Sequence, residues 1–275
     1  MLPVQDSLFT EMFLRFSIVA ILVIGLGITI NMSLISKQEI KTITQGSKNQ
    51  VFIEPPPKLP VFKQNILFAG DSMMQGVAPL TIKVLKNTHP GWQFDDQSRH
   101  STGLTVNRYV NWVEKIKNDV EAKNFTAVVV FLGPNDPWDI FLTGKLIRFP
   151  SDDWQINYNN KVREICDFIK MKRVHLVWVG LPNFKGKRLH DGARIQNKIF
   201  HTEMDRYGFD YLSTELLLGS LDEPFSSFIF DREDKKITVR SADGVHFTPK
   251  GLTILRDALT ERLEHSLADK QKYEN

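Results

Sequence analysis

From residue 63 onward, short and mainly apolar runs alternate with longer amphipathic segments. The runs at 65–69, 127–132 and 174–180 have the length of strands and are apolar at most positions, which is typical of parallel strands covered on both faces. Parallel strands need long crossover connections, and these are usually helices. The alternation therefore predicts an α/β domain, a three-layer α/β/α sandwich with a mostly parallel sheet.

The segments between the apolar runs have helical periodicity. We predict five helices, a further strand and a small hairpin: helices at approximately 77–87, 108–123, 152–171, 193–207 and 249–267, a strand at 209–212, and a hairpin formed by 228–230 and 237–239. The sequence contains no internal repeat or low-complexity tract. Residues 63–270 are therefore predicted to form one domain, followed by a polar tail at 271–275.

Before this domain lies an uncharged apolar run, residues 16–35. A helix of about 20 such residues crosses the hydrocarbon core of a bilayer. We predict that residues 1–37 contain a transmembrane signal anchor. The alternative is a cleaved signal peptide, but the run is long for that purpose and no Ala-x-Ala cleavage site follows it.

Residues 38–62 connect the predicted anchor to the domain and include Pro55, Pro56, Pro57 and Pro60. Proline removes a backbone donor and favours extended polyproline geometry, so this composition does not support a helix. We predict a linker that holds the domain away from the membrane.

The charge pattern argues against nucleic-acid binding. The chain has 35 Lys and Arg against 32 Asp and Glu, a formal net charge of +3, and the basic residues are scattered along it. Nucleic-acid binding needs basic residues gathered on one face. The only cysteine, Cys166, shares helical spacing with apolar residues and is predicted to be a core residue that is not a nucleophile.

A candidate nucleophile follows the first predicted strand in the segment Gly70-Asp71-Ser72-Met73. Open α/β sheets place their sites at the carboxyl ends of the strands, which is where Ser72 emerges. Taken alone, an Asp-Ser pair at a strand end is more often a helix cap.

A serine hydroxyl becomes a good nucleophile when a base takes its proton, and the C-terminal part of the chain supplies a base in Asp243-Gly244-Val245-His246. Asp243 and His246 lie three residues apart just before a predicted helix, so both can face one pocket. The carboxylate would orient the imidazole and stabilise its protonated form. Ser72, His246 and Asp243 are therefore the predicted catalytic residues.

Two further segments reach the same edge of the predicted sheet. Gly133-Pro134-Asn135-Asp136 follows the second buried strand, and Gly103 lies in the loop before the second helix. The side-chain amide of Asn135 and the backbone N–H of Gly103 can both donate hydrogen bonds to an oxyanion. Composition alone would make each segment a plain turn.

Together these four segments resemble the SGNH, or GDSL-like, hydrolase family, whose four marker blocks occur here in the same order. The chain is especially similar to the bacterial subgroup known as DUF459. The resemblance covers roughly residues 65–267 and implies a flavodoxin-like α/β/α sandwich. One departure is Met73, where the motif has leucine, and this exchange keeps apolar character and volume.

The resemblance also implies roles for the marker residues. Ser72 would attack an ester carbonyl, His246 would act as base and then acid, and Asp243 would orient His246. The oxyanion hole would consist of the Ser72 N–H, the Gly103 N–H and the Asn135 side chain. No organic cofactor is expected, and no metal, because His100, His201 and His246 show no metal-ligand spacing.

Residues beside the third block suggest a substrate surface. Trp138 can stack on a sugar ring, and we assign Trp138 and Asp136 to substrate binding, with Asp139 adjacent. A competing hypothesis makes Asp71 and Asp136 the acid and base of a glycosidase. The serine triad is preferred because the glycosidase hypothesis leaves Ser72 and His246 without a role.

From motifs and resemblance we expect a membrane-anchored esterase or O-acyltransferase. Its substrate would be an acylated, most simply acetylated, cell-envelope or exported polysaccharide, and a transferase would take its acyl group through a membrane-bound O-acyltransferase partner. The alternatives are a lipase or thioesterase, with the aromatic segment 141–149 lining an acyl channel, and a non-catalytic carbohydrate-binding module.

The expected location is the inner membrane, crossed once, with the catalytic domain in the periplasm or outside. Arg15 precedes the apolar run while Lys37, Lys41 and Lys48 follow it, and these charges alone would keep the domain cytoplasmic. A long translocated domain can override that bias, and the resemblance favours export.

Overall fold

The computed structural model describes residues 63–106 and 108–273. The predicted signal anchor at 16–35 and the proline-rich linker at 38–62 lie outside these residues. Among the helices that the structure does describe, none combines the length and the apolar character needed to cross a membrane.

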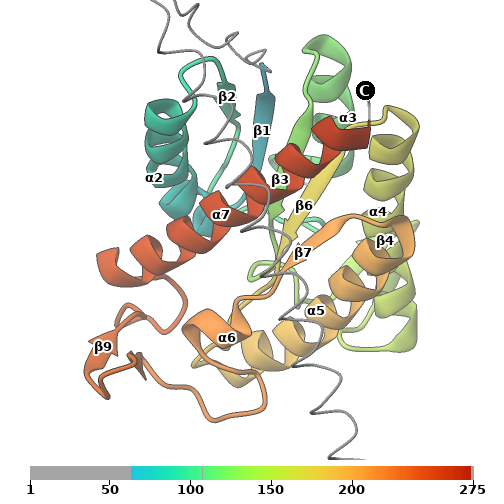
Figure 1. Cartoon of the computed structure of the whole chain (residues 1–275). Helices are drawn as coiled ribbons and strands as arrows, with labels where there is room; N and C mark the ends of the chain where they lie inside the picture. The colour runs from blue at the N-terminus through green and yellow to red at the C-terminus, as the bar shows by residue number, and fades with distance from the viewer. Residues whose placement is uncertain (1–62, 107, 274–275) are drawn as a thin grey trace, which may run out of the picture. The chain divides into compact units, whose positions relative to one another are not determined.

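A five-stranded parallel sheet forms the centre of the domain (Figure 1). Its strands, in spatial order, are β2 (Gln93–Asp96), β1 (Asn65–Gly70), β3 (Ala127–Phe131), β6 (His175–Val179) and β7 (Asp210–Leu212). All four pairings between neighbouring strands are parallel. Counted along the chain, this is the 2-1-3-4-5 order of flavodoxin-like folds, so the predicted α/β fold with a mostly parallel sheet is confirmed.

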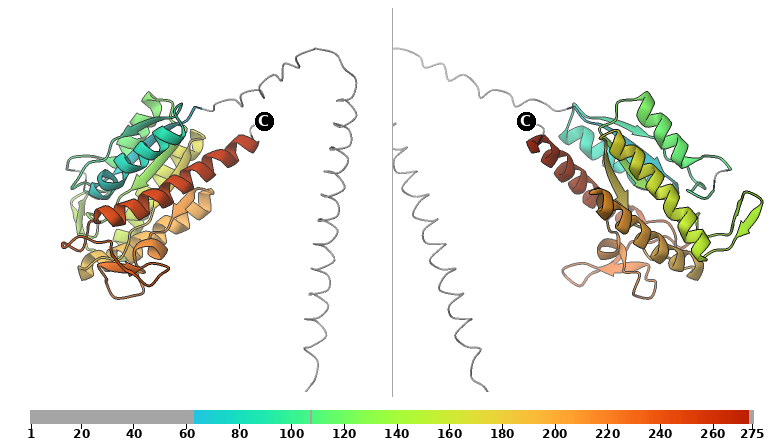
Figure 2. Two further views of the ribbon diagram at one scale, coloured as in Figure 1. Left: turned by 60° about the vertical axis from the view of Figure 1, so that its left-hand side comes forward. Right: turned by 90° about the vertical axis from the view of Figure 1, so that its right-hand side faces the viewer.

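Helices cover both faces of this sheet, as Figures 1 and 2 show. On one face α2 packs against α7, and on the other α4 lies between α3 and α5. Their bounds are α2 (Ser72–Thr88), α3 (Trp112–Ala122), α4 (Asp152–Met171), α5 (Lys187–Tyr207) and α7 (Pro249–Tyr273). Each of the three central strands is buried along nearly its whole length, as the apolar runs predicted.

Several element bounds differ from the predictions. Helices α2 and α5 begin five and six residues earlier than predicted, at Ser72 and Lys187. Asp71 caps α2 directly after β1, and the first turn of α5 is mostly polar and does not follow the apolar periodicity. Helix α3 begins later, at Trp112, because the Asn111 side chain caps it. Helix α7 continues to Tyr273, so residues 271–273 of the predicted tail are helical.

Some short elements were missed. Strand β2 reads Gln-Phe-Asp-Asp because it lies at the sheet edge, partly exposed, and therefore lacks an apolar run. The hairpin of β4 (Ile140–Leu142) and β5 (Lys145–Ile147) and the short helix α6 (Glu215–Leu218) were also not predicted. The predicted C-terminal hairpin is present, as β8 (Phe228–Phe230) and β9 (Lys236–Thr238).

The core contains the side chains of Trp112, Trp154 and Trp178, all fully buried. Cys166 is also fully buried on α4, and burial raises the pKa of its thiol to about 12. A thiol in this environment stays protonated and is a poor nucleophile, so Cys166 is a core residue, as predicted.

Gly70, the last residue of β1, tests how tightly the sheet edge is packed. A Cβ atom there would lie 2.3 Å from the Phe131 carbonyl oxygen and 2.5 Å from the Met74 Cβ. Gly70→Ala is expected to lower the free energy of unfolding by about 1–3 kcal/mol, measured by urea denaturation, because backbone has to move. Gly186→Ala is the control, since the nearest neighbour of its Cβ would be 4.0 Å away, and we expect a loss below about 1 kcal/mol. Equal losses in the two variants would contradict this account.

Candidate active site

The loops that follow the strands gather at one end of the domain, the lower end in Figure 1. Because the sheet is parallel, every strand delivers its following loop to this end. The predicted site residues come from the loops after β1, β2 and β3, and from the loop that precedes α7. We refer to this end as the catalytic edge.

Ser72 is the first residue of α2 and directly follows Asp71, which caps the helix. The Asp71 side chain accepts a hydrogen bond of 2.8 Å from the Met73 N–H. Asp71, and not Ser72, therefore performs the capping role. The hydroxyl of Ser72 is left to interact with a residue from elsewhere in the chain.

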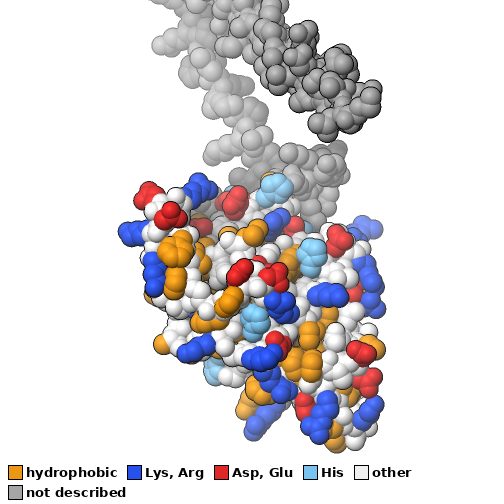
Figure 3. All heavy atoms as spheres, turned by 90° about the horizontal axis from the view of Figure 1, so that it is seen from below, with side chains coloured by type: hydrophobic (Ala, Val, Ile, Leu, Met, Phe, Trp, Pro, Cys, Tyr) orange, Lys and Arg blue, Asp and Glu red, His pale blue; other side chains and the backbone are white. Residues whose placement is uncertain are grey.

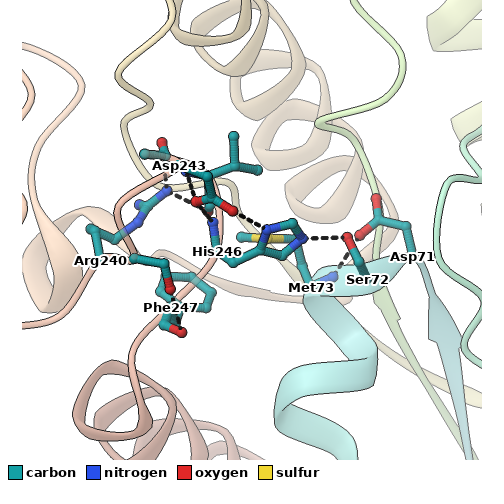
Figure 4. Close-up of polar contacts among 10 residues, drawn as sticks. Asp71, Ser72, Met73, Arg240, Asp243, His246 and Phe247 are labelled. Carbon is teal, nitrogen blue, oxygen red and sulfur yellow. Dashed lines mark hydrogen bonds and ion pairs between the residues drawn. The ribbon is translucent and has the colours of Figure 1, made fainter.

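That partner is His246, whose Nε2 lies 2.9 Å from the Ser72 Oγ (Figure 4). On the other side of the ring, Nδ1 lies 2.7 Å from Oδ2 of Asp243. Figure 4 shows the three side chains in a row, Asp243 to His246 to Ser72. The structure thus brings the three predicted catalytic side chains together in one hydrogen-bonded chain, although Ser72 and His246 are 174 residues apart in the sequence.

The electrostatics of Asp243 suit the orienting role. Desolvation alone would raise its pKa, but the hydrogen bond from the His246 ring and those from the Val245 and His246 N–H groups lower its pKa to about 2. Asp243 is therefore ionised at neutral pH and its two oxygens are fixed by three donors. A fixed carboxylate holds the imidazole in the tautomer that presents a lone pair to the serine.

Arg240 supports the loop that carries Asp243 and His246, and sequence reasoning did not identify it. Its side chain is 1% exposed and donates to the carbonyl oxygens of Asn183 at 2.8 Å and Val245 at 2.6 Å. The guanidinium lies 4.9 Å from the ring centre of Phe247 and 5.3 Å from that of Phe184. Arg240 thus binds the catalytic loop to the loop after β6 from inside the domain.

Two buried carboxylates join the remaining loops. Asp71 accepts hydrogen bonds through Oδ1 from Met73 and through Oδ2 from the Gly133 N–H, at 3.1 Å. It therefore connects the nucleophile to the loop after β3. Burial raises the pKa of Asp71 to about 7, although its two backbone donors act in the opposite direction.

The second buried carboxylate, Asp136, holds the loop that contains Gly103. It accepts hydrogen bonds from the Leu104 N–H at 3.1 Å, the Thr105 N–H at 2.8 Å and the Tyr158 hydroxyl at 3.1 Å. A Cβ on Gly103 would lie 2.2 Å from Oδ1 of Asp136. Only glycine at position 103 lets the two loops approach this closely.

Three donors are arranged around this junction. The Asn135 amide donates to the Thr102 carbonyl oxygen at 2.9 Å, which places Asn135 beside the Gly103 loop. Within the residues that the structure describes, the N–H groups of Ser72 and Gly103 donate no hydrogen bond to a protein acceptor. Two free N–H groups and an amide side chain on loops that meet beside the nucleophile are suited to bind an oxyanion.

The assignment of Asp136 to substrate binding is wrong. The side chain is fully buried and its two oxygens are occupied by protein donors, so it positions a loop. Burial of Asp71 and Asp136 likewise prevents either from reaching a glycosidic bond, which removes the basis of the glycosidase hypothesis. Trp138, by contrast, is 51% exposed and remains accessible to a substrate.

Other predicted features take different positions. Phe141 is 74% exposed on the β4–β5 hairpin, whereas Phe149 packs edge-on against Trp154, so the two rings do not form one acyl channel. Across the part of the chain that the structure describes, no group of three or more His, Cys, Asp or Glu residues is arranged to hold a metal ion.

One family model covers most of the domain. The family described as "Protein of unknown function (DUF459)" matches residues 65–262. No curated protein sequence matches the chain.

Solved structures with a similar fold share little sequence. A GDSL-like lipase from Bacteroides thetaiotaomicron has a TM-score of 0.50 at 12% identity, with 74% of this chain and 89% of that chain covered. A structure described as a putative acylhydrolase, from Bacteroides fragilis, has a TM-score of 0.52 at 12% identity, with 74% of this chain and 88% of that chain covered. An acetylxylan esterase from Geobacillus stearothermophilus has a TM-score of 0.52 at 13% identity, with 72% of this chain and 93% of that chain covered. At such identities the similarity establishes the fold.

The buried carboxylates predict an unusual dependence of stability on pH. The pKa of Asp71 is about 7 in the folded protein, against an ordinary value of 3.8. A group whose pKa is raised on folding stabilises the protein below its unfolded pKa, and the contribution is lost as pH rises through the folded pKa. We expect the free energy of unfolding, from urea denaturation, to fall by on the order of 2 kcal/mol between pH 5 and pH 8.

The control separates Asp71 from other titrating groups. Asp71→Asn cannot ionise and should reduce the pH dependence, whereas Asp257→Asn, with a 62% exposed side chain, should leave it unchanged. Stability that rises between pH 5 and pH 8 in the wild-type chain would refute the assignment.

Proposed function

The chain belongs to the DUF459 family, and from this premise we propose that it is an SGNH-type serine esterase that forms an acyl-enzyme on Ser72. The observation that carries the proposal is the hydrogen-bonded chain from Asp243 through His246 to the Ser72 hydroxyl. This arrangement has the parts that acyl transfer requires: a nucleophile, a base and a group that orients the base.

In the first half-reaction the Ser72 Oγ attacks the ester carbonyl carbon, and Nε2 of His246 takes the hydroxyl proton. The imidazolium that forms is stabilised by the ionised Asp243. The negative charge on the former carbonyl oxygen is bound by the Ser72 and Gly103 N–H groups and the Asn135 amide. When the tetrahedral intermediate collapses, His246 returns the proton to the departing alcohol.

In the second half-reaction a water molecule gives its proton to His246 and attacks the acyl carbon. A second tetrahedral intermediate uses the same oxyanion donors. Its collapse releases the carboxylic acid and restores the Ser72 hydroxyl. Every proton in the cycle passes through Nε2 of His246, because Nδ1 is occupied by Asp243.

The accessibility of the triad supports a large substrate with small acyl groups. The side chains of His246 and Asp243 are 46% and 48% exposed, so the reacting atoms lie near the surface. An ester on a polymer can reach such a site, whereas a long acyl chain needs an apolar channel. We therefore propose acetyl groups on a polysaccharide as the substrate. Among the structural neighbours, an acetylxylan esterase supports this choice by analogy.

Hydrolase and O-acyltransferase share this chemistry and differ in whether water or a sugar hydroxyl attacks the acyl-enzyme. We propose hydrolysis as the basal reaction. For a transferase, the acyl donor would come through a membrane-bound O-acyltransferase. A sugar acceptor that suppresses release of free acetate while it becomes acetylated would identify the transferase.

We also propose that residues 16–35 anchor the chain in the inner membrane and that the catalytic domain lies outside the cytoplasm. The uncharged run supports the anchor. An alkaline phosphatase fusion at Asn275 is expected to be active, because that reporter works only after export. An inactive phosphatase together with an active cytoplasmic reporter at the same position would reverse the orientation.

Removal of the nucleophile tests the proposed reaction. Ser72→Ala in the full-length chain is expected to lower kcat for p-nitrophenyl acetate by on the order of 10³ or more, since the acyl-enzyme cannot form. Ser227→Ala, at an exposed serine outside the triad, is the matched control and should retain wild-type turnover. Equal turnover by the wild-type and Ser72→Ala chains would rule out Ser72 as the nucleophile.

A further inference from the structure

Two exposed basic side chains lie on loops that are hydrogen-bonded to the segments carrying Ser72 and Asp243. Neither side chain belongs to the catalytic machinery. They are Arg99, in the loop after β2, and Lys185, in the loop after β6. In the described part of the chain neither side chain forms an ion pair or a hydrogen bond with another residue. By contrast, Arg148, Lys187 and Arg188 on neighbouring segments each pair with a carboxylate.

Arg99 is tied to the nucleophile through the backbone. Its N–H donates to the Gly70 carbonyl oxygen at 2.8 Å, two residues before Ser72. Its own carbonyl accepts from the Thr102 hydroxyl at 2.6 Å, next to Gly103. The backbone of Arg99 is therefore fixed between the nucleophile and the proposed oxyanion loop, while its side chain extends into solvent.

Lys185 is tied to the other end of the triad. Its N–H donates to the Gly244 carbonyl oxygen at 3.2 Å, and Gly244 directly follows Asp243. The Lys185 Cβ would lie 2.3 Å from a Cβ built on Gly244, so the two loops are in close contact. In the sheet, β2 and β6 lie on opposite sides of β1, which carries Ser72. Arg99 and Lys185 thus flank the nucleophile.

Between them, the loop after β3 presents an aromatic platform at Trp138. The indole is 51% exposed, and the guanidinium of Arg188 lies 4.7 Å from its ring centre. Arg188 is itself fixed by the Pro137 carbonyl at 2.7 Å and by Asp139. Trp138 is three residues from Asn135, a span of at most about 10 Å, so the ring lies within reach of a sugar bound at the oxyanion donors.

Acidic side chains near the catalytic edge are already engaged. Asp243 holds His246, and Asp139 pairs with both Arg148 and Arg188. Asp191 pairs with Lys187, and the Asp96 carboxylate binds the Ser98 hydroxyl and N–H. Figure 3, which views the domain from this end, shows Lys and Arg side chains beside hydrophobic ones over this face. Asp96 and Asp243 keep their negative charge in these contacts. Arg99 and Lys185 add two positive charges that no carboxylate of the described chain pairs with.

We propose that the polysaccharide bound at this edge is acidic: its negatively charged groups pair with Arg99 and Lys185, and a sugar ring stacks on Trp138. The inference rests on the proposed function and specifies its substrate. A neutral glycan would gain nothing from two unpaired cations, whereas a uronate-containing chain supplies carboxylates on both sides of the reacting acetyl group. Charges of this kind act on binding and on the rate of encounter.

The experiment measures binding separately from turnover. The full-length Ser72→Ala chain is titrated with polygalacturonate and with xylan, as acidic and neutral probes, at low and moderate salt. We expect polygalacturonate to bind more tightly than xylan, with a preference that decreases with salt because exposed charges are screened. In the Arg99→Gln plus Lys185→Gln double variant, the ratio of the affinity for polygalacturonate to that for xylan is expected to fall about tenfold or more. Each exposed pair of a cation with a carboxylate contributes up to about fivefold in affinity.

Lys83→Gln is the matched control, because it removes the charge of an exposed residue on α2 away from the catalytic edge. It should leave the ratio unchanged. The proposal is overturned if wild-type preference for polygalacturonate is absent, or if the double variant and Lys83→Gln behave alike. Binding to phosphatidylglycerol vesicles that the double variant weakens and Lys83→Gln does not, without binding to polygalacturonate, would also overturn it and would identify a lipid surface.

Turnover distinguishes this proposal from the proposed esterase activity. Release of acetate from acetylated polygalacturonate and acetylated xylan by the wild-type chain should show the same preference as binding. Charge-selective binding without Ser72-dependent hydrolysis of p-nitrophenyl acetate would remove the esterase and retain the acidic ligand. Ser72-dependent hydrolysis of p-nitrophenyl acetate without charge-selective binding would retain the esterase and remove the acidic ligand.

Discussion

Two fully buried carboxylates, Asp71 and Asp136, hold the loops of the catalytic edge together. Burying an ionised carboxylate costs several kcal/mol unless hydrogen bonds compensate. Here the compensation comes from backbone N–H groups of neighbouring loops: those of Met73 and Gly133 for Asp71, and those of Leu104 and Thr105 for Asp136. The hydrogen bonds that stabilise the buried groups therefore also set the positions of the nucleophile and of the proposed oxyanion donors.

The base and its orienting carboxylate depend on a different support. Their loop has little regular structure, and Arg240 holds it from within the domain by donating to backbone carbonyls while its guanidinium packs among phenylalanine rings. Desolvation lowers the pKa of Arg240 to about 10, which still leaves it protonated at neutral pH. The catalytic edge thus combines buried carboxyl groups under the nucleophile with a buried cation under the base.

The sequence predicted the parts of this arrangement that follow from periodicity or from local motifs. The buried strands have clear apolar runs, and their parallel direction is enough to place Ser72 and Asn135 at one edge. Gly103 follows β2 and was placed there only by the family resemblance. The roles of Asp71 and Asp136 were not predictable, because an aspartate in a turn has the same local sequence whether it faces solvent or the core. Arg240 was missed for a related reason: a single arginine outside any motif gives no sign of burial. Strand β2 was missed because edge strands need not be apolar.

The charged and aromatic side chains around the triad bear on substrate preference, which the triad itself does not specify. The triad and its donors define acyl transfer, whereas the surrounding side chains Arg99, Lys185 and Trp138 determine what can bind there. The two sets consist of different residues, so substrate preference can change in this fold while the chemistry is retained.

The central claim is that His246 activates Ser72 as a nucleophile. Incubation of the full-length chain with a fluorophosphonate, followed by mass spectrometry of its peptides, tests this most directly. The account predicts one covalent adduct, on the peptide that contains Ser72, and a much slower reaction in His246→Ala. An adduct on another serine, or labelling of Ser72 at the same rate without His246, would contradict it.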